Sequence, residues 1–73
     1  MMIDEIKILD PVAVIEDLPE HGLRRGEVGT VVDVWQDGAL EVEFSDTSGE
    51  AYAFVALQSD KLIPLYYGHR EAA

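Results

Sequence analysis

The residues from Leu40 to Phe44 alternate strictly between apolar and acidic side chains, and this alternation strongly constrains the fold. Successive side chains of a β-strand point to opposite faces, so the pattern predicts a strand with one buried and one solvated face. Asp37-Gly38 lies just before it and is typical of a turn, and Val28 to Trp35 before that turn is rich in β-branched residues. We therefore predict a β-hairpin.

The hydrophobic pattern also predicts the length of the hairpin loop. A two-residue turn would place apolar residues of the first strand on the face of the glutamates, whereas a three-residue loop, 36–38, avoids this mismatch. We predict the longer loop, with Gly38 in the left-handed conformation that a residue without Cβ adopts easily. The predicted pairs are Val34 with Leu40, Val32 with Val42, and Thr30 with Phe44.

This register predicts a solvent-facing side of the hairpin that carries both acidic and apolar residues. Its expected members are Val31, Asp33, Trp35, Ala39, Glu41 and Glu43. Asp33 falls opposite Glu41, and like charges placed opposite each other are mildly destabilising. We interpret this pair as part of a solvated face, and docking of a cation or a basic side chain is the alternative.

The remaining chain consists of short apolar runs separated by glycine, proline and aspartate, as in small β-barrels. We predict an all-β, five-stranded SH3-like small barrel with one short helical turn, 58–61, before the last strand. A single domain is expected over 1–67, followed by a flexible tail, 68–73. The expected strands are Val12–Ile15, Val28–Trp35, Ala39–Phe44, Ala51–Leu57 and Leu62–Tyr66.

Size and charge limit the classes of function. A chain of 73 residues has room for one modest core, and the absence of cysteine excludes disulfides and thiolate metal sites. Acidic residues outnumber basic ones by 15 to 5, for a net charge of −10, which repels nucleic acid and anionic membranes and attracts basic partners. Solubility alone is the alternative reason for this charge. With no signal peptide and no membrane-length apolar run, we expect a cytoplasmic protein.

The sequence contains no pattern typical of a catalytic or metal site. It has neither cysteine nor a Gly-x-Ser-x-Gly motif, and its serines lie in turn segments. His21 lies beside Glu20 and near Asp17, but this spacing matches no ligand motif. We expect no enzymatic activity, no cofactor and no metal.

Apolar residues exceed what one small barrel can bury. The run Ala51–Leu57 is apolar on both of its faces, whereas a half-exposed strand alternates. Burial through barrel curvature is one explanation, and a contact surface is the other. We favour the contact surface and expect a homo-oligomer. The interface candidates are Ile15, Val31, Trp35, Tyr52, Phe54 and Tyr66.

Arg24-Arg25 is the one basic cluster, and it lies in a loop between Gly22 and Gly26. These arginines are predicted to hold the loop by pairing with nearby acidic residues. The alternative is that they contact a carboxylate of a partner, where the forked guanidinium gives direction.

Residues 16–32 read Glu16-Asp17-Leu18-Pro19-Glu20-His21-Gly22-Leu23-Arg24-Arg25-Gly26-Glu27-Val28-Gly29-Thr30-Val31-Val32, and Val42-Glu43-Phe44 and Gly49 follow farther along the chain. This pattern resembles a family of short bacterial proteins described as a domain of unknown function. The resemblance runs from about Leu9 to Leu65. It implies a compact SH3-like barrel and no defined activity. Some members accompany toxin-like neighbours, which suggests an antitoxin or immunity role.

More distantly, Gly26-Glu27-Val28-Gly29-Thr30-Val31 is similar to the Gly-x-x-Gly-x-Val motif of ribosomal and transcription-factor barrels, whose loops often contact RNA. Here the basic residues of that class are missing apart from Arg24-Arg25, so the electrostatic interaction with phosphate, which supplies most affinity in such proteins, has the wrong sign. We therefore predict a non-enzymatic protein-interaction module. The alternatives are an antitoxin-type partner of a basic protein and, less favoured, an RNA-binding barrel.

Overall fold

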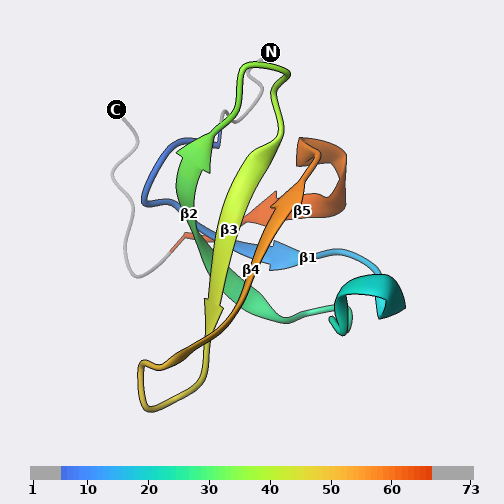
Figure 1. Cartoon of the computed structure of the whole chain (residues 1–73), viewed down its shortest axis with the longest axis vertical. Helices are drawn as coiled ribbons and strands as arrows, with labels where there is room; N and C mark the ends of the chain where they lie inside the picture. The colour runs from blue at the N-terminus through green and yellow to red at the C-terminus, as the bar shows by residue number, and fades with distance from the viewer. Residues whose placement is uncertain (1–5, 67–73) are drawn as a thin grey trace.

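The computed structural model describes residues 6–66, which form one antiparallel sheet with the strand order β4-β3-β2-β1-β5 (Figure 1). The strands are β1 (Pro11–Val14), β2 (Val28–Val34), β3 (Leu40–Ser45), β4 (Ala51–Leu57) and β5 (Leu62–Pro64). Two 3-10 turns, η1 (Pro19–His21) and η2 (Ser59–Lys61), precede β2 and β5. The predicted all-β class and the helical turn before the last strand are confirmed. Within residues 6–66, β4 and β5 are the two edge strands and do not pair with each other, so the topology does not establish the expected closed SH3-like barrel. The predicted tail, 68–73, lies outside the described residues.

The core is apolar throughout, and residues 6–66 contain no buried polar or charged side chain. Leu18 and Leu23 attach the long β1–β2 loop to the core. The backbone carbonyl of each accepts the backbone N–H of the other, and both side chains are buried. The main buried cluster comprises Val12, Val14, Leu18, Leu23, Val31, Leu40, Val42, Phe44, Leu57 and Leu62.

The β2–β3 loop has the predicted three residues. The Trp35 N–H donates to the Ala39 carbonyl over 2.8 Å, and the Gly38 N–H donates to the Trp35 carbonyl over 2.9 Å. Gly38 has a φ of 92°, as expected for the left-handed position of this loop. The Asp37 carboxylate accepts the Ala39 N–H, which completes the turn.

The predicted register holds near this loop and is wrong farther from it. Val34 pairs with Leu40 and Asp33 with Glu41, as expected. The register then shifts between Val31 and Asp33, so that Val32 is the extra residue of a β-bulge. The observed pairs beyond the bulge are Val31 with Val42, Thr30 with Glu43, and Gly29 with Phe44.

This bulge overturns the expected placement of Val31. A shift of one residue moves a side chain to the opposite face of a sheet. Val31 therefore packs in the core with 0% of its surface exposed, and it does not lie on the solvent face. Ala39 is also buried, at 8% exposure, although it was expected on that face.

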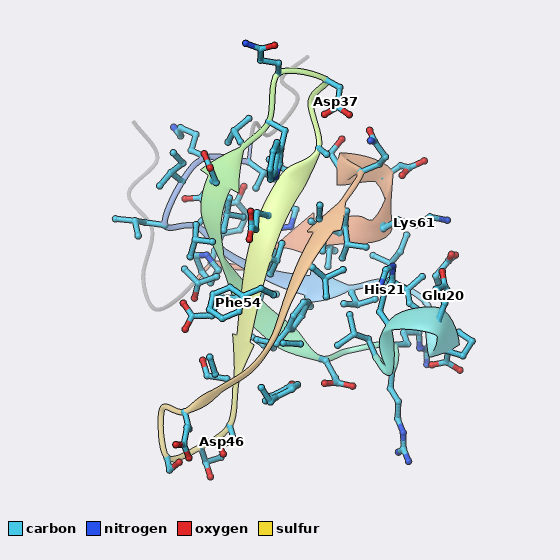
Figure 2. The ribbon with its side chains drawn as sticks, in the orientation of Figure 1. Glu20, His21, Asp37, Asp46, Phe54 and Lys61 are labelled. Carbon is cyan, nitrogen blue, oxygen red and sulfur yellow. The ribbon has the colours of Figure 1, made fainter. Side chains whose placement is uncertain are left out.

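The β3–β4 hairpin repeats the loop design of the β2–β3 hairpin at the opposite end of the sheet, where Figure 2 shows Asp46 far from Asp37. The Asp46 N–H donates to the Glu50 carbonyl, and the Gly49 N–H donates to the Asp46 carbonyl. The Asp46 carboxylate accepts bonds from the Ser48 hydroxyl and from two backbone N–H groups. These bonds, that of the Ser48 hydroxyl first, lower the pKa of Asp46.

Gly29 allows β2 and β3 to approach more closely than another residue would permit. A Cβ at this position would lie 2.6 Å from Cγ1 of Val42, 2.8 Å from the Glu43 carbonyl oxygen and 2.9 Å from Cδ1 of Phe44. Two of these neighbours are fully buried side chains and the third is backbone, so none can move away freely.

We therefore expect Gly29→Ala to lower the free energy of unfolding by about 3 kcal/mol through overpacking. Gly38→Ala is the comparison, because a Cβ at Gly38 meets nothing within 4 Å and only its positive φ is unfavourable, which costs about 1 kcal/mol. Urea unfolding followed by the fluorescence of Trp35 measures both variants. An equal loss of stability in the two variants would contradict the tight approach at Gly29.

Candidate interaction surface

The solvent side of β2, β3 and β4 presents two rows of side chains that cross the sheet. One row runs from Asp33 through Glu41 to Ala56, and the next runs from Thr30 through Glu43 to Phe54. Trp35 follows Asp33 by two residues and extends the same side toward the loop. We call this surface the acidic face and define it by Asp33, Trp35, Glu41, Glu43, Phe54 and Ala56.

Two aromatic side chains flank the carboxylates of the acidic face. Trp35 is 50% exposed at one end, and Phe54 is 59% exposed at the other. The ring of Phe54 extends from β4 across the line of β3 in Figure 2. Exposed aromatic residues that border charged ones are typical of protein-binding surfaces.

The negative charge of the acidic face is not neutralised by any residue within 6–66. Among residues 6–66 the only salt bridge joins Lys61 Nζ to Glu16 Oε2 over 2.7 Å, near η2 and the end of β1. Asp33 accepts only the backbone N–H of Val34, and no hydrogen bond or ion pair within the described range involves the carboxylates of Glu41 and Glu43. A cation from another molecule would therefore meet uncompensated charge.

The six predicted interface residues do not form one surface. Trp35 and Phe54 lie on the acidic face, whereas Val31 is buried beneath the sheet. Ile15 and Tyr66 are 43% and 50% exposed and follow β1 and β5, at the other end of the strand order. The acidic face includes Ala56, which the sequence reasoning missed because an exposed alanine carries no signal of its own.

Tyr52 faces away from the acidic face despite its place in β4. The register between β3 and β4 shifts beside it, so Phe44 pairs with Ala53 and Ser45 with Ala51. Its ring lies 6.4 Å from that of the buried Phe44, centroid to centroid. Tyr52 therefore covers one end of the core, although about half of its surface is exposed.

Glu27 joins β4 to the β1–β2 loop through both of its carboxylate oxygens. The Tyr52 hydroxyl donates to Oε1 over 2.6 Å, and the Arg24 backbone N–H donates to Oε2 over 2.7 Å. The Tyr52 hydrogen bond is the main cause that lowers the pKa of Glu27. The same bond is the main cause that raises the pKa of Tyr52 to about 12.

Arg24 and Arg25 are held in their loop by backbone bonds. The Arg25 N–H donates to Oδ1 of Asp17 over 2.8 Å, as the Arg24 N–H does to Glu27. Asp17 and Glu27 therefore hold the loop, but through main-chain amides rather than the guanidinium pairs that we expected. In the part of the chain that the structure describes, neither guanidinium forms a salt bridge.

No metal-ligating cluster and no membrane-spanning helix are found in the described structure. Residues 6–66 contain no group of three or more His, Asp or Glu side chains that could hold a metal ion, and His21 with Glu20 in η1 forms no such group. Within the same range, no helix has the length and apolar character required to cross a membrane.

A family model described as "Domain of unknown function (DUF4926)" matches residues 8–64. This range includes all five strands and both 3-10 turns. Comparison with curated proteins and with solved structures gives no match.

The Tyr52–Glu27 bond predicts an unusual tyrosine titration. In the ultraviolet absorbance of the protein, one tyrosine is expected to ionise near pH 12 instead of near its ordinary value of 10.0. Glu27→Gln should bring this transition down toward 10, and Tyr52→Phe should remove it. Glu16→Gln, which removes an acid without contact to Tyr52, is the matched control. A high transition that persists in Tyr52→Phe would contradict this assignment.

The same bond predicts the pH range of its contribution to stability. The pKa of Tyr52 is raised in the folded state, so its contribution is complete below pH 10 and is lost as the pH rises toward about 12. The pKa of Glu27 is lowered, so its contribution is present above its ordinary value of 4.5 and is lost as the pH falls through the lower folded value. We expect Tyr52→Phe to cost about 0.5–1 kcal/mol at neutral pH, and this difference should shrink above pH 10 in urea unfolding.

Proposed function

Because the chain belongs to the DUF4926 family, whose description states no activity, we propose its function from its surface: it is a non-enzymatic protein-interaction module that binds through the acidic face. The observation that carries this proposal is the placement of half-exposed Trp35 and Phe54 on either side of carboxylates that form no salt bridge within residues 6–66. Aromatic side chains provide most of the binding energy at many interfaces, and flanking charges set the preference for a partner.

We also propose that the sheet is the SH3-like small barrel that the sequence predicts. The support is topological: the first strand pairs with both β2 and the last strand, and a 3-10 turn precedes that last strand. In this arrangement the acidic face lies on the β2–β3–β4 part of the sheet, away from the core.

Self-association is the first mode of interaction that we propose. A chain of 73 residues owns little core, and half-exposed Trp35 and Phe54 would bury apolar surface against a second copy. The net charge of −10 on each copy opposes this association, and added salt screens the repulsion.

A basic protein partner, including an antitoxin-type target, is the second candidate. Glu41 and Glu43, which have no partner among the described residues, favour it. RNA binding through Arg24 and Arg25 receives less support, because Asp17 and Glu27 lie against the backbone of the same loop and add negative charge there.

We expect light scattering coupled to gel filtration to give a mass above that of the monomer, and the apparent mass should rise with salt concentration. Trp35→Glu and Phe54→Glu should each shift the protein toward monomer, because each removes an apolar contact and adds like charge. Ile63→Glu is the matched control, since Ile63 is equally exposed on β5. A wild-type protein that is monomeric at every concentration and salt would exclude self-association. Loss of assembly in the Ile63 variant alone would place the contact on the β5 side.

A further inference from the structure

The two edges of the sheet differ sharply in how far they are open to another strand. β5 has only three residues and ends at Pro64, and both features limit pairing at an edge. β4 has seven residues, Ala51–Leu57, with neither charge nor proline. In the described chain β4 pairs only with β3 (Figure 1). A bulge at Tyr52 leaves Ala53–Leu57 as its regular stretch, with one side of the backbone unpaired.

If another strand paired with β4, one of its side chains would lie beside Ala56 on the acidic face. The row of residues through Ala56 determines which kind of side chain suits that position. Ala56 is exposed at the edge, and Glu41 and then Asp33 follow it across the sheet. Glu41 lies two strand spacings, about 10 Å, from an added strand. Because alanine is small, a long side chain beside Ala56 can extend over it toward Glu41. Lysine and arginine have both the length and the charge for this position.

The row through Phe54 sets a preference for a second side chain of the added strand. Phe54 is the edge member of this row, and Glu43 lies behind it on β3. The Phe54 ring is 59% exposed, so a side chain beside it would contact an aromatic surface. An apolar side chain, or the apolar stem of a lysine or arginine, suits this contact.

We propose that β4 accepts an extended segment of a basic protein as a sixth strand, with a lysine or arginine beside Ala56 and an apolar or basic side chain beside Phe54. This inference rests on the proposed function and names the partner of the same surface. Backbone bonds to β4 would supply affinity, and the two rows of the acidic face would supply specificity.

At the edge of β4, charge complementarity favours a basic segment over the β4 strand of a second copy of the chain. A β4 strand from another copy carries no basic residue, so it would leave Asp33 and Glu41 without a cation. Each copy would also bring a net charge of −10 to the contact. A basic segment instead neutralises the acidic face while it pairs the open edge.

The test uses the full chain and synthetic strand peptides with capped ends. The probe alternates lysine with valine; one control replaces lysine by glutamate, and a second keeps the lysines but carries N-methyl groups on alternate backbone nitrogens. Trp35 fluorescence gives the affinity, and amide hydrogen exchange reports protection in β4. We expect the lysine peptide to bind and to slow exchange within Ala53–Leu57, and we expect neither control peptide to do so.

Variants of the protein locate the contact. Asp33→Asn combined with Glu41→Gln should weaken binding roughly fivefold to tenfold, as expected for two exposed charge pairs. Glu20→Gln combined with Asp60→Asn removes the same charge from η1 and η2 and should leave the affinity unchanged. Ala56→Lys should abolish binding, because its own ammonium would occupy the space over Glu41. Thr47→Lys, in the β3–β4 loop, is the control for that change.

The outcomes separate this inference from the proposed function. Equal binding of the N-methylated peptide, or protection outside β4, would overturn strand addition. If no peptide binds and β4 becomes protected only as protein concentration rises, a second copy is the occupant; the inference then fails while the proposed function stands. If no peptide binds and the protein stays monomeric without β4 protection, the inference fails and self-association fails with it.

Discussion

Separate contacts fix the register of β2 against β3 at each end of the pair. The two registers differ by one residue, and the rest of the sheet depends on how β2 accommodates that difference. At one end the three-residue loop around Gly38 sets Val34 against Leu40. At the other end Gly29 lies against Phe44, where no Cβ would fit. β2 has one residue more than β3 between these two pairs, and the bulge at Val32 accommodates it.

The two bulges decide which side chains reach solvent. The bulge in β2 turns Val31 into the core, and the bulge beside Tyr52 brings its ring to Phe44 and its hydroxyl to Glu27. As a result, Val31 is fully buried, and Tyr52 contacts the core although about half of its surface stays exposed. The aromatic residues that remain on the acidic face are Trp35 and Phe54.

Two groups of acidic residues have different physical roles. Asp17, Glu27, Asp37 and Asp46 accept backbone N–H groups that the loops would otherwise leave unpaired. Glu41 and Glu43 make no such bond within the described chain and stand on the sheet surface instead. Solubility alone would not require carboxylates to gather between two aromatic residues, and this arrangement supports a binding role for the second group.

The sequence by itself determined the all-β class, the central strands, the three-residue loop and the left-handed Gly38, because these follow from local alternation and turn chemistry. It also placed Trp35 and Phe54 among the expected surface residues. Only the tertiary structure decided on which face of the sheet the side chains of Val31 and Tyr52 lie. A bulge forms where contacts between distant segments require pairing registers that differ by one residue. No local pattern within β2 or β4 encodes that difference. The unequal edges, β4 open and β5 short, likewise follow from the strand order and not from either strand alone.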